Sequence, residues 1–445
     1  MAPLKSTAGS NPKTLIVVYL RGGADGLSLV APTNDPIYIS SRGPAAIPPS
    51  SVTTPNETTY LTDYFDLAPA AKDLASIYTS GRLAFSHVTG LPNQVLSHFD
   101  AQDYMETGTD LEADPIIQPT DGWLGRFLSL PGINQTTNLT LSGIHIGTAA
   151  SKTIFGSSQS VPIADPRFYA LPLADALVTV GGSPEPAREY FLENSYADGL
   201  LPQSTPQTIP QLVAEVGTAA LGAIDIMAQV DFDETTYDTY WDTIHSDIRP
   251  IVSITTQHPF ARQLWSAAQL VKANCDVTPQ IDGLGLQAIT IDFSGWDDHV
   301  NLDPLARNLL ENGFYSRQRF LCQALAAFED ELNTAGCGDD YVLVVMSEFG
   351  RRITINGSLG FDHGRGNCWI VMGCGVQGQQ VFSDGWEASA DITTVTEDSN
   401  LTIRIDMQDL LAEILIDNCG LDVNDIDKVF PGKTPVNYDP PGIIA

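Results

Sequence analysis

The sequence predicts an α/β fold: a doubly wound, mostly parallel sheet flanked by helices. Apolar runs rich in Leu, Ile and Val at residues 13–20, 288–293 and 341–346 have the length of buried strands. Stretches of helical composition lie between such runs, as in a parallel α/β sheet. The first run stops at the glycine-rich turn of residues 21–26, which is typical of a central parallel strand. With 445 residues, 43% of them hydrophobic, the chain can bury a large core.

The expected elements follow one another along one domain, 1–445. After the first strand we expect a helix at 67–80, a strand at 82–88, a helix that begins after Ser97, a strand at 288–293, a helix at 305–335, strands at 341–346 and 368–372, and a helix at 407–416. Residues 156–250 differ in composition and carry a strand at 176–180, helices at 186–194 and 211–230, and a linker rich in Pro, Gln, Ser and Thr. They predict a mainly helical insertion or cap within the domain.

The composition excludes some classes of partner. Acidic residues outnumber basic ones by 54 to 22, and the net charge of −32 argues against nucleic acid, because binding phosphates requires an excess of cationic groups. No apolar run approaches the roughly 20 residues needed to span a bilayer, so no membrane span is expected. An anionic substrate is still compatible with this charge if a bound cation reverses the field locally.

Cysteine spacing and the N-terminus bear on the cellular compartment. The six cysteines form no CxxC pair, so they predict buried thiols, or one or two disulfides, rather than a structural zinc site. Residues 1–11 are polar and lack the apolar centre of a signal peptide. We expect a periplasmic or extracellular protein whose export signal has been removed.

Acidic and imidazole side chains lie next to the predicted strands. Asp25 lies in the glycine turn after the first strand, Asp297 and His299 follow a later core strand, and Glu348 follows the next one. His363 lies just before the last core strand. Carboxylates and imidazoles from distant segments suit a divalent metal such as zinc, manganese, magnesium or calcium. The sequence therefore predicts a metal site at the carboxyl edge of the sheet.

Ser97 is the candidate nucleophile. It occupies the expected N-cap of a helix, where backbone N–H groups can face an anion. A metal that lowers the pKa of a hydroxyl would let Ser97 react near neutral pH. Simpler roles stay open: Ser97 as a helix cap, Asp25 as a turn residue, and Glu348 as the partner of a nearby arginine. The neighbouring His98 is not assigned as a base, since adjacency in sequence does not bring a base to its nucleophile.

At these positions the sequence resembles a known family. The motifs that carry the resemblance are Leu20-Arg21-Gly22-Gly23-Ala24-Asp25-Gly26-Leu27, Ser97-His98-Phe99, Gly122-Trp123-Leu124-Gly125-Arg126, Trp296-Asp297-Asp298-His299, Ser347-Glu348-Phe349-Gly350-Arg351 and Asp362-His363-Gly364. They are similar to the domain-of-unknown-function 1501 family, which is placed in the alkaline phosphatase and sulfatase superfamily. The resemblance runs in order from about residue 13 to residue 432.

The resemblance implies a metal site and an export route. By superfamily analogy, Asp25, Asp297, His299, Glu348 and His363 would be the metal ligands and Ser97 the nucleophile, and members often carry a twin-arginine export signal. The chain has Glu348-Phe349 where many alkaline phosphatases have an Asp-His pair, and the spacing from Asp297 to His299 is shorter than usual. A one-ion site and a two-ion site therefore stay open.

The preferred function is a metal-dependent hydrolase of phosphate or sulfate esters, acting on an anionic small molecule or an extracellular polysaccharide. Arg126, Arg351 or Arg365 would bind the leaving oxygens. The alternative is a non-catalytic secreted protein that binds carbohydrate or a surface and keeps a structural metal. A metal-free serine hydrolase is less favoured, because no Gly-x-Ser-x-Gly motif surrounds Ser97.

Overall fold

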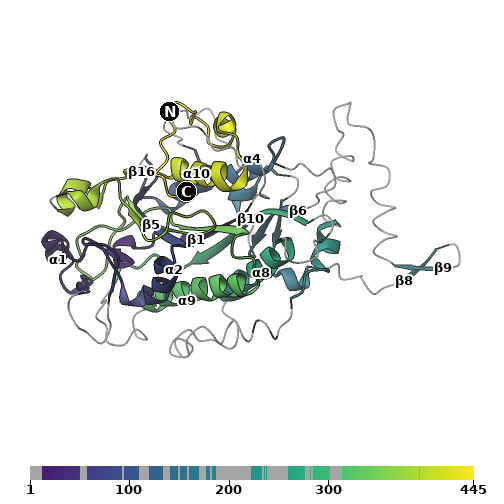
Figure 1. Cartoon of the computed structure of the whole chain (residues 1–445), viewed down its shortest axis with the longest axis horizontal. Helices are drawn as coiled ribbons and strands as arrows, with labels where there is room; N and C mark the ends of the chain where they lie inside the picture. Colours follow the sequence, from purple (N-terminus) through teal and green to yellow (C-terminus); the bar gives the residue numbers. More distant parts are fainter. Residues whose placement is uncertain are drawn as a thin grey trace.

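The computed structural model shows a sheet between two layers of helices (Figure 1). It describes residues 13–50, 58–92, 95–109, 120–133, 141–148, 151–157, 160–169, 177–180, 183–186, 222–232, 235, 237, 259–275, 281, 284–300, 313–389 and 391–445. The structural statements below concern these residues.

Nine strands of the described chain form the central sheet, and eight of them follow the order β13-β5-β12-β11-β1-β10-β6-β7. The strands are β1 (Thr14–Arg21), β5 (Leu83–Gly90), β6 (Leu141–Ile146), β7 (Ser160–Ile163), β10 (Leu284–Ser294), β11 (Tyr341–Met346), β12 (Asn367–Gly373), β13 (Val381–Phe382) and β16 (Ile405–Asp406), which pairs with β5. Each core strand predicted from the sequence is present within a few residues of its expected bounds. β1 lies centrally, with β10 and β11 as its parallel neighbours.

One long strand of this sheet runs against the others. β12 pairs antiparallel with β11 and β5, whereas β7, β6, β10, β1 and β11 pair in parallel. The prediction of a mostly parallel sheet is confirmed. Because β12 is reversed, the loop that precedes it meets the loops that follow the parallel strands, at the edge where α/β sheets bind ligands.

Helices cover both faces of the sheet (Figure 1). The main helices are α2 (Ala75–Thr79), α3 (His98–Thr107), α4 (Trp123–Leu128), α8 (Pro259–Asn274), α9 (Gly313–Thr334) and α10 (Met407–Cys419). Successive residues of β1 enter different cores: Ile16 and Val18 pack with residues of α8 and α9, and Leu15 and Val17 pack with residues of α4 and α10. Both faces of the strand are therefore buried, which confirms the doubly wound class.

One predicted helix is interrupted. The helix expected at 67–80 consists of the end of strand β4 (Asp66–Leu67), a 3-10 helix (Pro69–Leu74) and the short helix α2. Pro69 has a fixed φ and no N–H group, so it begins a new helical segment instead of continuing an earlier one. The helix expected at 305–335 is present from Gly313 as α9, and residues 301–312 lie outside the described residues.

The predicted insertion at 156–250 is described only in part. The strand expected at 176–180 is present as β8 (Leu177–Val180), which pairs with β9 (Ser183–Pro186). Residues 222–227 are helical and belong to the helix expected at 211–230. Residues 187–194 and 211–221, the rest of the two predicted helices, lie outside the described residues.

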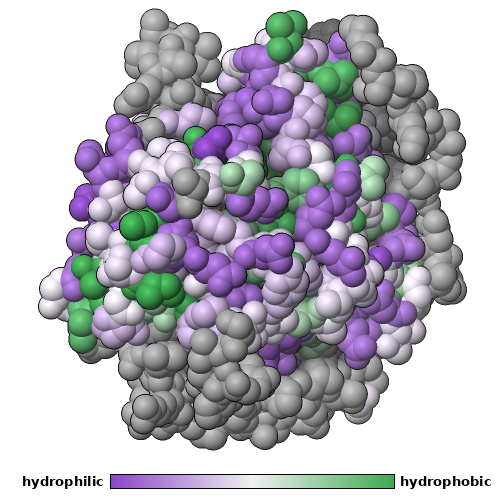
Figure 2. All heavy atoms as spheres, turned by 60° about the vertical axis from the view of Figure 1, so that its left-hand side comes forward, coloured by the Kyte–Doolittle hydropathy of each residue, from purple (hydrophilic) through white to green (hydrophobic). Residues whose placement is uncertain are grey.

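The cysteines and the surface agree with a water-exposed, oxidised protein. Cys275 at the end of α8 and Cys337 after α9 form a disulfide, one of the two arrangements expected from the sequence. Figure 2 shows a face on which hydrophilic side chains surround separate hydrophobic ones, as on an ordinary water-exposed surface. Among the described helices, none has the length and apolar character needed to cross a membrane.

Candidate metal centre

Loops at the carboxyl edge of the sheet bring five polar side chains together. β5 leads to α3, whose first residue is His98, and β10 leads to Asp297 and His299. Glu348 follows β11, and His363 precedes the reversed strand β12. The parallel pairing of β1 with β10 and β11 fixes the strand ends side by side, so the loops that leave them meet.

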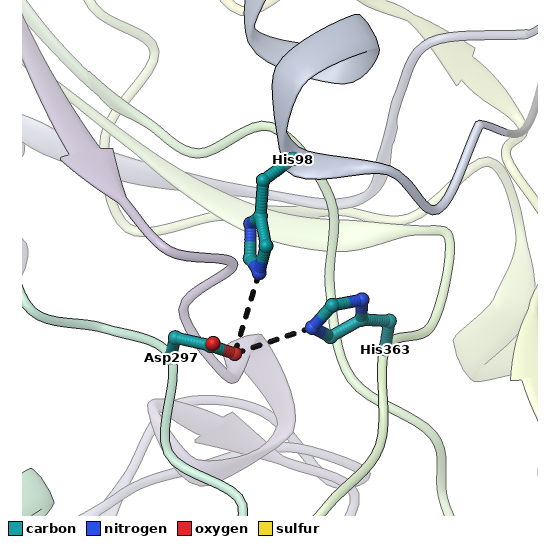
Figure 3. Close-up of side chains that lie close together, drawn as sticks. All are labelled: His98, Asp297 and His363. Atoms are coloured by element: carbon teal, nitrogen blue, oxygen red, sulfur yellow. Dashed lines mark hydrogen bonds and ion pairs between the residues drawn. The ribbon is translucent and has the colours of Figure 1, made fainter.

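Asp297 Oδ1 is the centre of the cluster (Figure 3). It lies 2.8 Å from His299 Nε2, 3.2 Å from His363 Nε2 and 3.4 Å from His98 Nε2. The metal-binding atoms of His98, Asp297 and His363 all lie within 4.8 Å of one another. His299 Nε2 is also 3.2 Å from His363 Nε2. The Asp297 side chain is 47% exposed, so solvent reaches the cluster.

The other ring nitrogens of two histidines are bound to acceptors. His363 Nδ1 lies 3.0 Å from the carbonyl oxygen of Leu96, and His98 Nδ1 lies 3.0 Å from Glu348 Oε1. Because both partners can only accept, each Nδ1 carries the hydrogen, and a neutral ring then has a lone pair on Nε2. His98 Nε2 is buried and makes no hydrogen bond. Lone pairs and a carboxylate oxygen therefore converge on one point, an arrangement that a cation stabilises.

Glu348 supports His98 from behind. Its carboxylate is buried and accepts hydrogen bonds from Gly22 N at 2.8 Å and from His98 Nδ1 and Gln102 Nε2 at 3.0 Å each. Burial raises the pKa of Glu348, but these hydrogen bonds outweigh burial and the net pKa is lowered. The hydrogen bond to Glu348 raises the pKa of His98. The geometry favours Glu348 as the residue that orients His98, whereas the sequence predicted a metal ligand.

Arg351 ties the loops of the site together. It is buried and donates to four backbone carbonyl groups, those of Gly22, Gly23, Trp296 and Phe361. It also donates to Asp297 Oδ1 at 2.8 Å. Partial burial raises the pKa of Asp297, but its contacts with Arg351 and His363 lower it more, so the pKa stays well below its ordinary value. The guanidinium nitrogens of Arg351 are thus bound to the protein and hold Asp297 in position, and the binding of a leaving oxygen by Arg351 stays a prediction.

The spacing of the donor atoms fits a small divalent ion. Zinc bonds of about 2.0–2.1 Å in a tetrahedral arrangement place neighbouring ligand atoms about 3.3 Å apart. The histidine nitrogens lie 2.8–3.4 Å from Asp297 Oδ1, which spans this value. Imidazoles with one carboxylate suit zinc or another transition metal better than calcium or magnesium, which prefer oxygen ligands. His98, Asp297 and His363 would hold the ion, with His299 as a further donor.

Asp25 lies in a buried ion pair. Its Oδ1 accepts a hydrogen bond from Arg42 Nη2 at 3.0 Å, and its Oδ2 binds Arg42 Nη1 and Ser28 Oγ. Asp25 is 4% exposed and Arg42 is fully buried. Both carboxylate oxygens are therefore used within the core. This arrangement favours a structural role for Asp25, and its role as a metal ligand stays a prediction.

The two remaining predicted catalytic residues have different surroundings. Ser97 lies at the N-cap of α3 as expected, and its side chain makes no capping hydrogen bond. Its role as nucleophile stays a prediction. Arg126 donates to the carbonyl oxygens of Val429 and Thr107 and so joins α4 to the end of α3 and to the C-terminal segment. These contacts favour a structural role for Arg126, and its binding of a leaving oxygen stays a prediction.

Two residues of the cluster were missed by the sequence analysis. His98 begins the helix that follows β5, and Gln102 lies four residues later on the same helical face. Gln102 Oε1 accepts from Arg21 Nη1 at 3.1 Å while its Nε2 donates to Glu348. The signal for His98 was its position just after a core strand. This position indicates a site residue only if β5 runs parallel to β1, and the sequence does not give that direction.

The fold and the cluster define an α/β protein with a histidine–carboxylate site at the carboxyl edge of a doubly wound sheet. Residues 237–430 match the model of the family described as Protein of unknown function (DUF1501), the family that the sequence motifs resemble. The matched segment contains Asp297, His299, Glu348 and His363, whereas His98 precedes it. No curated protein matches the chain.

Solved structures similar to this chain include alkaline phosphatase superfamily proteins and sulfatases. A protein in the alkaline phosphatase superfamily from Vibrio parahaemolyticus is 11% identical with a TM-score of 0.31, and the match covers 84% of this chain and 62% of that one. Ps i-CgsB in complex with k-i-k-neocarrahexaose is 10% identical with a TM-score of 0.36, and the match covers 97% and 78%. BT1596, a 2-O GAG sulfatase, is 11% identical with a TM-score of 0.29, and the match covers 83% and 66%. The chain therefore spans about 62% of the length of the Vibrio protein. The order and direction of the strands, with helices on both faces of the sheet, establish the fold class.

Proposed function

We propose that the protein is a metal-dependent hydrolase of phosphate or sulfate esters. One observation carries this proposal: the Nε2 atoms of His98 and His363, each with its Nδ1 bound to an acceptor, face the same oxygen of Asp297. Such a set of donors binds a divalent cation. When bound, the ion would attract the ester oxygens and lower the pKa of a hydroxyl group beside it.

The residues around this point have separate tasks in the proposal. Arg351 holds Asp297 as a carboxylate, and Glu348 fixes the ring of His98 so that Nε2 faces the site. Ser97, next to His98 at the start of α3, is the proposed nucleophile. Its hydroxyl would lose its proton and form a bond to phosphorus or sulfur as the alcohol leaves, and water would then cleave the new ester.

The proposed substrates are anionic small-molecule or polysaccharide esters outside the cytoplasm. The disulfide Cys275–Cys337 supports an exported protein, because disulfides persist in oxidising compartments. The net charge of −32 makes a bound cation the natural means of attracting an anionic ester.

Metal analysis of three variants tests the proposal. We expect the purified protein, after incubation with zinc, manganese and calcium in turn and removal of excess ion, to retain about one equivalent. Asp297→Asn should lose it, because the variant removes the shared anionic ligand, whereas Asp398→Asn, an exposed carboxylate elsewhere, should keep it. Ser97→Ala should keep the metal but lose at least about 10³-fold in hydrolysis of an aryl phosphate or sulfate.

Two results would contradict the proposal. The first is a protein that binds none of the ions under any of these conditions. The second is an Asp297→Asn variant with unchanged metal content. Full hydrolysis by Ser97→Ala with the metal bound would remove Ser97 from the mechanism while leaving the metal site in place.

A second candidate is a non-catalytic protein that binds carbohydrate and keeps a structural metal. One observation favours it: Arg351 and Arg126, two of the three arginines expected to bind the leaving oxygens, use their guanidinium groups within the protein. Bound metal that raises the unfolding temperature, together with no turnover of any phosphate or sulfate ester tested, would select this candidate.

A further inference from the structure

A cavity of about 440 Å³ opens at the carboxyl end of β10. Its walls are the last residues of β10 and the first turns of α8 and α9, including Phe260, Phe293 and Phe320. Gln263, Ser294 and Arg317 add an amide, a hydroxyl and a cation to these aromatic side chains. The volume is in the range of pockets that enclose small organic ligands.

A second cavity of about 220 Å³ lies next to the first. Pro259 and Gln263 line both cavities, and the second one extends along the ends of β6 and β7 to Pro166 and Arg167. The next residue, Phe168, is 72% exposed, and the guanidinium of Arg167 lies 4.7 Å from the centre of its ring. The two neighbouring cavities are together named here the β10–β7 groove, and the exposed ring of Phe168 lies next to its far end.

The near end of the groove adjoins the metal cluster. Ser294 lies three residues before Asp297. Arg317, in the cavity wall, forms an ion pair of 2.7 Å with Asp298, the residue after Asp297. A chain lying in the groove would therefore reach the cluster with one end.

We propose that the β10–β7 groove binds an oligosaccharide, with the sugar that carries the ester next to the cluster and further sugars extending toward Phe168. The placement of an ester-bearing sugar at the cluster rests on the proposed function, whereas the binding of a sugar chain in the groove does not. A pyranose ring offers apolar C–H faces, which match the exposed ring of Phe168, and a rim of hydroxyl groups, which match the amide, hydroxyl and ion-paired groups that line the cavities.

The lining disfavours other long ligands. Arg317 and Arg167 are paired with Asp298 and Asp165, so the groove presents balanced charge rather than the excess of cations that nucleic acid requires. A lipid chain would bring the polar atoms of Gln263 and Ser294 into contact with hydrocarbon, at a cost in desolvation. Hydroxyl groups of a sugar can exchange hydrogen bonds with all of these side chains.

The test measures binding against chain length. Oligosaccharides of two to eight units from several polysaccharides, with and without sulfate groups, are screened on an array, and binders are then measured by calorimetry. We expect affinity to rise with length until both cavities are filled. Phe168→Ala should weaken binding of a hexasaccharide about fivefold and leave a disaccharide and an aryl ester unaffected. Tyr60→Ala, another exposed aromatic, is the matched control and should change nothing.

A second variant tests the junction of the cavities. Gln263 lines both cavities, so Gln263→Trp should fill the space between them and abolish the gain in affinity with chain length. Unfolding curves and metal content check that the variant folds. No binding on the array, binding of peptides in place of sugars, or equal hexasaccharide affinity in the Phe168 variant and the parent would each overturn the proposal. Aryl ester hydrolysis without sugar binding would remove the groove proposal alone, and sugar binding without any hydrolysis would remove the proposed function alone.

Discussion

The substitution Asp25→Asn separates two roles that the sequence leaves open for this carboxylate. In the structure, Asp25 faces the guanidinium of Arg42 through both oxygens, and Arg42 also donates to the carbonyl oxygen of Arg352 and lies 3.7 Å from the ring centre of Phe361. The ion pair therefore joins the turn after β1 to the segment that leads to His363. It does not contact the metal cluster.

The expected cost of Asp25→Asn follows from burial. With Arg42 fully buried and Asp25 4% exposed, the variant leaves a guanidinium in the core without its anion. Breaking a buried pair by removing one partner costs roughly 3–5 kcal/mol. The amide of Asn keeps one acceptor for Arg42, so we expect a loss of unfolding free energy near the lower figure, about 3 kcal/mol.

Two assays on the same protein preparations decide between the roles. Urea unfolding gives the loss of stability, and elemental analysis gives the metal content, each compared with Asp297→Asn. The structure predicts that Asp25→Asn is destabilised with its metal retained, and that Asp297→Asn loses metal. An Asp25→Asn variant with parental stability and no metal would refute this reasoning and restore Asp25 as a ligand.

Three further outcomes follow from other contacts. Glu348→Gln should fold but bind metal roughly 10–100-fold more weakly in a chelator competition, because a neutral amide orients His98 less firmly; unchanged affinity would count against the orienting role. Burial raises the pKa of Glu413 to about 7, so the unfolded chain releases this proton at a lower pH than the native state does. The free energy of unfolding should therefore fall by roughly 3 kcal/mol as the pH rises from about 4.5 to about 7. Denaturant unfolding at several pH values should show this slope in the parent and a flatter curve in Glu413→Gln; identical slopes would exclude this carboxyl group as the source. Replacing Cys275 and Cys337 by serine removes a link across 62 residues and should lower the free energy of unfolding by about 4 kcal/mol in the chain-entropy model. Denaturant unfolding of the variant and of the parent under non-reducing conditions measures this loss, and the reduced parent should show the same loss.

The sheet was predictable because its strands are short, continuous apolar runs buried on both faces, as β1, β10 and β11 are. Strand direction was not predictable in the same way. An apolar run has no signature of parallel or antiparallel pairing, so the reversal of β12 appears only in the structure. Likewise, the helix expected at 67–80 had a suitable composition, but the helical segment begins only at Pro69 and its first six residues form a 3-10 helix.

Position after a core strand predicts which residues reach the carboxyl edge of the sheet, but not which residues they meet there. Asp25, Asp297 and Glu348 all follow core strands, yet only Asp297 lies where the Nε2 atoms of the histidines converge, and Glu348 contacts His98 through Nδ1 instead. The difference lies in which cation or donor each carboxylate meets: Asp25 meets Arg42 in the core, and Glu348 is enclosed by N–H groups of Gln102 and the backbone. These partners come from segments far away in the chain, so spacing alone gives no access to them.

The reversed direction of β12 determines which loops reach the candidate site. In an all-parallel sheet, only loops that follow strands reach the carboxyl edge, and a loop that precedes a strand lies at the opposite edge. His363 precedes β12, so it can face Asp297 only because β12 runs antiparallel to β11. The reversal also places β5 parallel to β1, which brings the start of α3, and with it His98 and Ser97, to the same edge. One change of strand direction therefore assembles two of the three histidines around Asp297.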